Sequence, residues 1–317
     1  MSLIATIGAV EIGLVYALVA LGVFLSFRVL EFPDLTVDGS FPLGAAVAAT
    51  LITSGLDPVS ATLIAIIAGA CTGLITAWLN VRFGILQLLA SILTMIALFS
   101  VNLRVMGKPN VSLLGQNTLI DYFAWAKPAF AALGLPAQAS LKTAVVGVLV
   151  IFITVLVGRF LTSEFGLAMR ATGANPRMAR AQGIATERQI YCGMALSNGL
   201  VALAGALFAQ TAGFADVTVG TGTIVVGLAA VILGETILPT RSILVKLVAC
   251  ILGSILYRLA IALALNSGAL GLQASDLNLV TAVLVGVALI LPGARNPLKT
   301  MLRRKGATDN TQSGAAS

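Results

Sequence analysis

The sequence predicts an all-α polytopic membrane protein, and three observations support that prediction. Hydrophobic residues make up 58% of the 317 residues and charged residues only 10%, whereas a soluble domain carries about 25% charged residues. The apolar residues are gathered in runs close to the length of about 20 that a helix needs to cross the hydrocarbon core. Basic residues cluster between these runs. We therefore expect about nine transmembrane helices, with a range of about 8–10.

Nine apolar runs are the candidates for these helices. The run that begins at Ser40 has only 14 residues, which is too short for a complete span, so we expect a partial or broken helix there. No Lys or Arg precedes Arg28, and the first run therefore lacks the basic region of a cleavable signal peptide. The runs are Leu3–Phe27, Ser40–Thr53, Val59–Leu79, Ile85–Met106, Thr143–Phe160, Ile190–Ala212, Thr221–Leu238, Ile243–Leu265 and Leu277–Leu291.

The basic residues predict the orientation of the chain. Five arginines lie between 159 and 188, and five Lys or Arg residues lie between 295 and 305. Cytoplasmic loops carry an excess of Lys and Arg, so both regions are predicted to be cytoplasmic. Counting single crossings backwards places 14 of the 19 basic residues inside, the C-terminus inside and the N-terminus outside. The net charge of +7 is thus a topology signal, and we expect no nucleic-acid partner.

The same pattern predicts the organisation of the chain. Residues 1–295 are predicted to form one transmembrane domain, with an external loop at 107–141 and a cytoplasmic loop at 161–189. The tail, residues 296–317, is expected to be cytoplasmic and disordered, because its end is rich in Thr, Ser, Gly and Ala.

Several kinds of chemistry are absent from the sequence. It contains no histidine, which removes the commonest general base and metal ligand. Cys71, Cys192 and Cys250 lie far apart in apolar runs and have no metal-ligand spacing. The sequence also lacks the Gly-x4-Gly-Lys-[Ser/Thr] loop that cradles nucleotide phosphates. We expect no catalytic residue, no metal and no cofactor bound by this chain.

A short motif occurs twice. Phe32–Val37 (FPDLTV) matches Phe214–Val219 (FADVTV), and each copy follows a long apolar run and precedes a shorter one. Five spans separate the equivalent runs, so the copies would face opposite sides of the membrane. Such an inverted repeat with broken or re-entrant segments is typical of transporters and indicates the translocation pathway. The alternative is a chance match in low-complexity apolar sequence.

Polar residues at these junctions and within spans are the candidates for the pathway, since a carboxylate facing lipid costs about 2.5–3.5 kcal/mol. The alternative for the acids is helix N-capping, and for the amides and hydroxyls it is hydrogen bonding between helices. The candidates are Asp34, Thr36, Asp38, Gln87, Asn198, Gln210, Asp216 and Thr218.

The cytoplasmic loop predicts two short helices. The first spans Glu164–Thr172 and is ended by Gly173, while Asn175 caps a second that begins at Pro176 and ends at Gly183. Met169, Met178 and the alanines around them would form an exposed surface of small residues and arginines, suited to a groove of a cytoplasmic partner.

This loop resembles the coupling-helix loop of ATP-binding-cassette (ABC) importer permeases, in the family that includes the branched-chain amino-acid and ribose permeases. Tyr16–Gly22 resembles that family's opening helix, and the stretch from Ser197 to Glu235 is most similar to the tryptophan/tyrosine-type permeases. The loop lacks the Glu-Ala-Ala opening of maltose-type permeases. The residues that match the loop motif are Gly166, Arg170, Ala171, Gly173, Asn175, Arg177, Ala179 and Gly183.

The resemblance implies the permease subunit of an importer in the bacterial inner membrane, which moves a small, amino-acid-like solute by alternating access. It implies two cytoplasmic ATP-binding subunits that use the ATP, an extracytoplasmic solute-binding protein, a second permease copy and surrounding lipid. The alternative is a secondary transporter driven by an ion gradient through Asp34, Asp216 and Glu235. The two-helix cytoplasmic loop favours the ABC importer.

Overall fold

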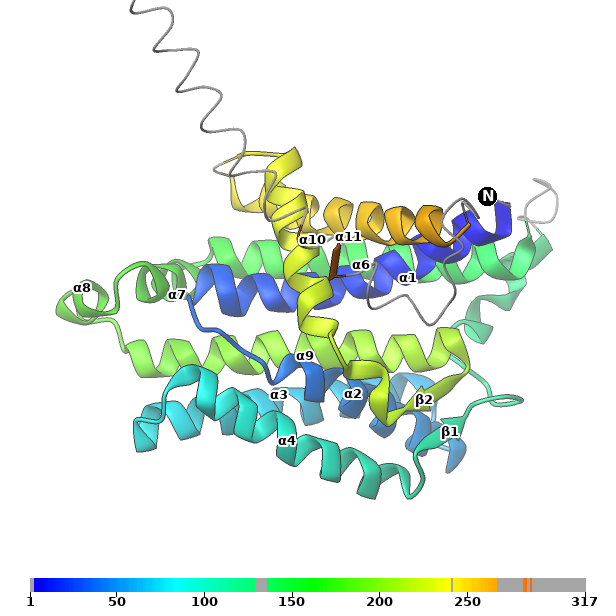
Figure 1. The fold of residues 1–317 in the computed structure, drawn as a ribbon, viewed down its shortest axis with the longest axis horizontal. Helices are drawn as coiled ribbons and strands as arrows, with labels where there is room; N and C mark the ends of the chain where they lie inside the picture. Colours follow the sequence, from blue (N-terminus) through cyan, green and yellow to red (C-terminus); the bar gives the residue numbers. More distant parts are fainter. Residues whose placement is uncertain (1–2, 129–135, 241, 267–281, 284–285, 287–317) are drawn as a thin grey trace, which may run out of the picture.

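The computed structural model is a bundle of long helices (Figure 1). It describes residues 3–128, 136–240, 242–266, 282–283 and 286. The helices and strands are α1 (Leu3–Val23), η1 (Phe24–Val29), α2 (Val37–Thr53), α3 (Pro58–Phe83), α4 (Gln87–Met106), β1 (Asn110–Ser112), η2 (Asp121–Ala126), α6 (Ala137–Thr162), α7 (Glu164–Ala174), α8 (Pro176–Ala181), α9 (Thr186–Ala212), β2 (Phe214–Asp216), η3 (Val217–Gly220), α10 (Thr223–Ile237) and α11 (Ile243–Asn266).

The prediction of a polytopic, mainly helical membrane protein is confirmed, whereas the count of nine spans is not. Seven segments of the described chain are long and apolar enough to cross a membrane. The run from Ser40 belongs to α2, an apolar helix of 17 residues that is too short for this class. The ninth run, Leu277–Leu291, lies almost wholly outside the described residues, as does the tail 296–317.

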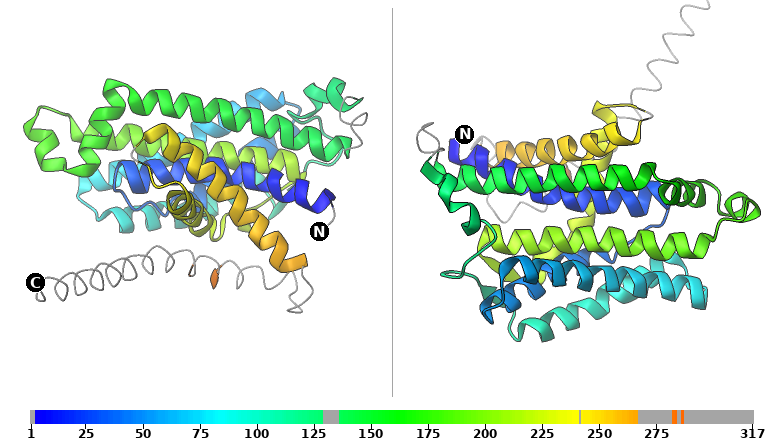
Figure 2. Two further views of the ribbon diagram at one scale, coloured as in Figure 1. Left: turned by 90° about the horizontal axis from the view of Figure 1, so that it is seen from above. Right: turned by 180° about the vertical axis from the view of Figure 1, so that it is seen from behind.

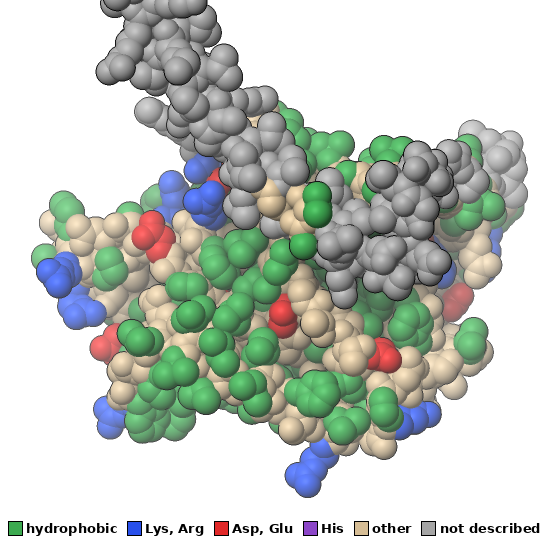
Figure 3. Space-filling view, viewed as in Figure 1, with side chains coloured by type: hydrophobic (Ala, Val, Ile, Leu, Met, Phe, Trp, Pro, Cys, Tyr) green, Lys and Arg blue, Asp and Glu red, His purple; other side chains and the backbone are tan. Residues whose placement is uncertain are grey.

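The long helices lie roughly side by side, with α7 and α8 at one end of the bundle and β1 and β2 at the other (Figures 1 and 2). On the face drawn in Figure 3, Lys and Arg side chains gather towards the ends and the edges, and hydrophobic side chains cover much of the middle. This distribution is typical of a membrane protein, in which apolar spans lie in the bilayer and Lys and Arg lie in the loops at its two surfaces.

The most buried spans are the first, Leu3–Val29, and α9. Helix α9 packs against α2 and α3, and α1 packs against α11 and α9. Small residues permit the close approach, since a Cβ on Gly44 would lie 2.0 Å from the Ala202 carbonyl oxygen and one on Gly205 would lie 1.9 Å from that of Phe41. The core of the bundle is therefore formed around α1 and α9.

Local signals in the sequence set several helix ends. The Asp57 carboxylate accepts hydrogen bonds from the backbone N–H groups of Val59 and Ser60, and Pro58 occupies the first turn of α3. Gly84 ends the same helix in the left-handed conformation, at φ +67°.

A two-stranded antiparallel sheet was not part of the all-α prediction. Strands β1 and β2 pair Val111 with Ala215. Each strand has only three residues, which is too short for an alternating pattern to appear in the sequence.

Candidate transport pathway and coupling surface

The chain is broken between the first span and α2. After α1 the backbone widens into the π-helix η1, where the Leu30 N–H donates to the Leu25 carbonyl at 3.0 Å. Glu31 then adopts φ +52°, which is uncommon for a residue other than glycine. π-helical turns occur frequently at functional sites. The break lies directly before the first predicted motif, Phe32–Val37.

Asp34 and Thr36 hold this break in place. The Thr36 N–H donates to Oδ1 of Asp34 at 2.9 Å, and Oδ2 accepts from the Asn198 side-chain amide of α9 at 2.7 Å. The Thr36 hydroxyl lies 2.8 Å from that of Thr76 on α3. All three predicted residues, Asp34, Thr36 and Asn198, have no exposed surface. The structure thus brings them together and ties the broken segment to two helices.

The network continues through residues that were not among the predicted ones. The Ser40 hydroxyl of α2 donates to Oδ1 of Asn198 at 2.7 Å and lies 2.8 Å from the Thr72 hydroxyl of α3. Thr72 and Thr76 are four residues apart and so share one face of α3, which is the signal that could have identified them. Because each member bonds another buried group, the cluster fixes the path of the chain.

Asp38 caps a helix, but not the one that begins beside it in the sequence. Its carboxylate, on the first turn of α2, accepts from the backbone N–H of Gly222 at 3.2 Å and of Ile224 at 2.7 Å, at the start of α10. Pro42 cannot donate to the Asp38 carbonyl, and a Cβ on Gly220 would lie 2.1 Å from that oxygen. The starts of α2 and α10 are therefore in direct contact.

A cavity of about 400 Å³ adjoins this contact. Asp38, Phe99, Asn102 and Thr221 are among its lining residues, from α2, α4 and the turn before α10. The Asn102 amide nitrogen donates to the Gly39 carbonyl at 3.2 Å, while its buried oxygen has no hydrogen-bond partner. A carboxylate and an amide oxygen near one cavity could accept hydrogen bonds from a polar solute.

The second predicted motif has a different environment. Asp216 is partly exposed at the end of β2, where its Oδ1 accepts from the Thr218 N–H at 2.8 Å and from the Thr218 hydroxyl at 2.6 Å. The Asn110 amide donates to its other oxygen at 3.3 Å. These hydrogen bonds, first that of the Thr218 hydroxyl, hold the pKa of Asp216 below its usual value.

The remaining two pathway candidates lie elsewhere. Gln87 is the first residue of α4 and is partly exposed. The buried Gln210 donates to the Thr62 hydroxyl at 2.8 Å and accepts from the Leu119 N–H at 3.0 Å, which fastens the loop before η2 to α9. The eight candidates therefore do not form one cluster.

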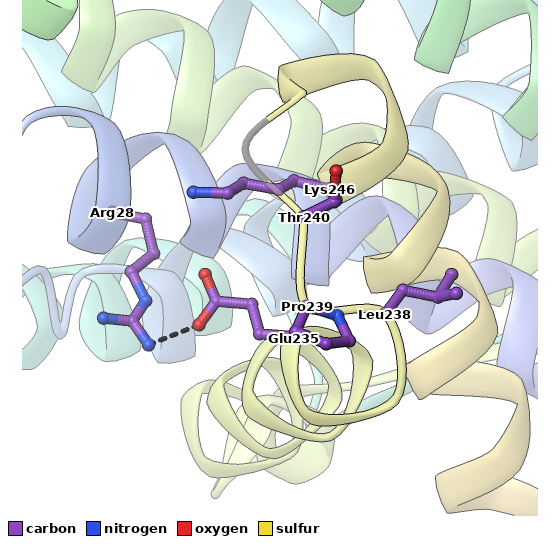
Figure 4. Close-up of a pocket in the computed structure, with 6 residues that line it drawn as sticks. All are labelled: Arg28, Glu235, Leu238, Pro239, Thr240 and Lys246. Carbon is purple, nitrogen blue, oxygen red and sulfur yellow. Dashed lines mark hydrogen bonds and ion pairs between the residues drawn. The ribbon is translucent and has the colours of Figure 1, made fainter.

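At the end of the bundle that carries α7, charged residues surround two neighbouring cavities. Arg28 of η1 and Glu235 of α10 form an ion pair at 2.5 Å, and Lys246 of α11 extends towards the same space (Figure 4). Their cavity measures about 460 Å³. The neighbouring cavity, of about 500 Å³, shares these three residues and is also lined by Arg170 of α7 and by Glu31. Helix α7 therefore adjoins the ends of η1, α10 and α11.

The prediction that Gly173 ends the first loop helix is wrong, because α7 continues through Ala174. A Cβ on Gly173 would lie 2.0 Å from the Val29 carbonyl oxygen, so glycine here permits backbone contact between α7 and η1. A Cβ on Gly166 would similarly lie 2.2 Å from the Phe160 carbonyl oxygen. Met169 of α7, predicted to be exposed, is fully buried.

The rest of the loop agrees with its predicted local structure. The Asn175 side chain accepts from the Met178 N–H at 3.0 Å and caps α8, which begins at Pro176. Gly183 follows α8 with φ +80°. Exposure divides the predicted coupling residues into three sets. Ala171, Asn175, Arg177 and Gly183 are exposed, Arg170 is partly exposed, and Gly166, Gly173 and Ala179 are buried.

The described residues contain no group of three His, Cys, Asp or Glu side chains that could hold a metal ion. The polar groups assembled here suit binding, helix capping and movement of the chain.

Comparison with known proteins identifies relatives of the whole domain. A tyrosine transport system permease protein of Clostridioides difficile is 35% identical over 284 residues, which cover 89% of each chain. An uncharacterised protein of Rickettsia prowazekii is 34% identical over 290 residues, 89% of this chain and 96% of its own length. A probable branched-chain amino acid transport permease of Methanocaldococcus jannaschii is 28% identical over 205 residues, 63% and 64% of the two chains.

The model of one protein family, described as the permease component of branched-chain amino acid transport systems, matches residues 6–291. This range contains α1 from residue 6 onwards, every later long helix described above, the broken segment and the α7–α8 loop. The chain therefore belongs to the family of branched-chain amino acid transport system permeases.

Proposed function

We propose that this permease is the membrane subunit of an ABC importer and moves a small amino-acid-like solute. The contact between the Gly173 backbone of α7 and the Val29 carbonyl carries the proposal. It joins the exposed loop, on which a cytoplasmic ATPase would act, to the π-helix that leads into the break before α2. The names of the related permeases, for tyrosine and for branched-chain amino acids, support this solute class.

The proposed partners follow from the two ends of the bundle. Two cytoplasmic ATP-binding subunits would dock on the exposed residues of α7 and α8, and an extracytoplasmic solute-binding protein would dock at the end that carries β1 and β2. The ATP would be bound and hydrolysed by those separate subunits, since this sequence has no phosphate-binding loop. A second permease copy would complete the pathway.

We assign the protein to the bacterial inner membrane, with the N-terminus outside and the C-terminus inside. The exposed arginines of α8 and the start of α9, together with the partly exposed Arg170 of α7, support this orientation by the positive-inside rule. The N-terminal end of α1 lies at the end of the bundle opposite α7 (Figure 1), as the proposed orientation requires.

We also propose that α2 and α10 are the paired broken helices of an inverted repeat. Both follow an Asp-x-Thr turn, and Asp38 of α2 caps the start of α10. The cavity beside this contact, lined by Asp38 and Asn102, would form part of the solute route. Broken helices at matching places in two halves are the usual site of such routes.

Coupling would then proceed along the chain. A shift of α7 presses on Val29, the π-helix changes its path, and the segment through Asp34 moves against α3 and α9. A π-helix suits this role, because its i→i+5 hydrogen bonds can be exchanged for the i→i+4 bonds of an α-helix by a local change in the backbone.

The test is Gly173→Ala in the complex reconstituted with its ATPase and solute-binding protein. The added methyl group would overlap the Val29 oxygen, so ATP-driven uptake should fall while basal ATP hydrolysis persists. Gly147→Ala is the matched control, because a Cβ there meets only Leu14 at 3.6 Å. Uptake equal to wild type in Gly173→Ala would contradict this coupling route. Uptake that needs an ion gradient and no ATP would instead favour a secondary transporter.

A further inference from the structure

An apolar groove is lined by residues of α3, α6, α7 and α9. Its volume of about 710 Å³ falls within the range of ligand pockets. Ile66 of α3, Leu156 of α6 and Cys192, Gly199 and Leu203 of α9 are among the lining residues, none of which is charged. Neighbouring side chains such as Ile67, Ile151 and Phe152 are more than half exposed, which suits contact with lipid.

The groove has the length of one bilayer leaflet. Cys192 and Leu203 are eleven residues apart on α9, which corresponds to about 16 Å at 1.5 Å per residue. One leaflet of the hydrocarbon core measures about 15 Å. Gly199 has no side chain to occupy the space between α9 and α3, where a Cβ would lie 3.5 to 3.7 Å from atoms of Ile66 and Ala70.

The positively charged Arg188 lies next to one end of the groove. Arg188 precedes Cys192 by one helical turn, so both residues lie on the same face of α9. Its guanidinium carbon lies 5.8 Å from the ring centroid of Phe165, a residue of α7 that also lines the groove. Arg188 is exposed, and among the described residues it forms no ion pair with a carboxylate. Its charge is therefore available to an anion at the membrane surface.

We propose that the groove binds an anionic phospholipid of the cytoplasmic leaflet, with one acyl chain along α9 and the phosphate at Arg188. The leaflet assignment rests on the orientation in the proposed function. A continuous apolar channel of leaflet length that ends at an arginine matches a lipid in both hydrophobicity and charge. Because Phe165 belongs to α7, the bound lipid would contact the coupling helix directly.

The test is native mass spectrometry of the full-length permease, delipidated in detergent and titrated with phosphatidylglycerol or phosphatidylethanolamine. Arg188→Gln should weaken phosphatidylglycerol binding about fivefold and leave phosphatidylethanolamine unchanged. Ala195→Phe, which fills the groove, should abolish binding of both lipids at this site. The controls are Arg82→Gln, an exposed arginine on α3, and Val148→Phe, a lipid-facing position of α6 outside the groove.

A measurement on the unmodified protein covers the case in which Ala195→Phe fails to fold. Cys192 lines the groove and Cys71 is exposed elsewhere, so phosphatidylglycerol should slow maleimide labelling of Cys192 relative to Cys71. Equal labelling, or equal phosphatidylglycerol binding by Arg188→Gln and wild type, would overturn the proposal. So would an Ala195→Phe variant that loses a dimer but keeps its lipid, because the occupant would then be a second permease copy. Lipid binding is measured without the ATPase, so its failure and a failure of ATP-driven uptake are distinguishable.

Discussion

The two Asp-x-Thr segments have the same local turn in opposite environments. In both, the first oxygen of the aspartate accepts a hydrogen bond from the threonine N–H two residues later, at 2.9 Å for Asp34 and 2.8 Å for Asp216. Asp34 is completely buried and accepts a hydrogen bond from the Asn198 side-chain amide. Asp216 is partly exposed and accepts one from the Asn110 side-chain amide. The local sequence specifies the turn, and the surrounding helices specify what the turn is attached to.

The consequence is a difference in mechanical role. The Asp34 turn is bonded to α9 and, through Thr36, to Thr76 of α3, so it cannot move without moving those helices or breaking buried hydrogen bonds. The Asp216 turn is bonded to Asn110, the exposed first residue of the short strand β1. Of the two turns, the first is placed to transmit a shift of α7 into the bundle.

The largest expected effect comes from removing each aspartate in turn. Asp34→Ala leaves the Thr36 N–H and part of the Asn198 amide without an acceptor inside the protein. This should lower the free energy of unfolding by about 2–4 kcal/mol and abolish uptake. Asp216→Ala removes a partly exposed cap and should lower the free energy of unfolding by about 0.5 kcal/mol. Unfolding in detergent, followed by circular dichroism, gives both values. Equal losses of stability would remove the distinction between the two turns.

Double-mutant cycles sharpen the same comparison. Asp34→Ala combined with Asn198→Ala should give a coupling free energy of about 1 kcal/mol, because the pair is buried and separated by 2.7 Å. Asp216→Ala combined with Asn110→Ala should be additive to within about 0.3 kcal/mol, since that contact is exposed and 3.3 Å long. Additivity of the buried pair would show that the Asp34–Asn198 bond does not hold the break in place.

The smallest expected effect is a pH dependence at Asp216. Because its folded pKa lies below its usual value of about 3.9, the ionised carboxylate stabilises the fold above that pH, and this contribution is lost as the pH falls through the folded pKa. The stability difference between wild type and Asp216→Asn should therefore stay constant from neutral pH to about pH 5 and shrink below about pH 4. A difference that grew on acidification would mean that Asp216 has a raised pKa.

Local features of the fold were predictable because each depends on a few neighbouring residues. Long apolar runs predicted most of the spans, and the short run from Ser40 predicted a helix too short for a complete span. Asn175 and Pro176 gave the start of α8. The role of Gly173 was misjudged for a physical reason: glycine ends a helix in the left-handed conformation, but it also permits close packing, and only the position of Val29 decides between the two.

The candidate site was predictable in part. Asp34, Thr36 and Asn198 were chosen separately and meet in one network, yet Ser40, Thr72 and Thr76 were missed because Ser and Thr are ordinary in membrane helices. Gln87 and Gln210 satisfied the same polarity criterion and lie elsewhere. Polarity within a span identifies a residue that needs a partner, but it does not identify the partner.

By itself the sequence determined that this chain crosses a membrane many times, where several helices begin, and which loop resembles a coupling element. These properties follow from hydrophobicity and from backbone preferences over short stretches. The tertiary structure alone decided that Asp38 caps α10, that α7 rests on Val29, and that one Asp-x-Thr turn is buried while the other reaches water. Those contacts join residues far apart in the chain, so they depend on how the helices pack.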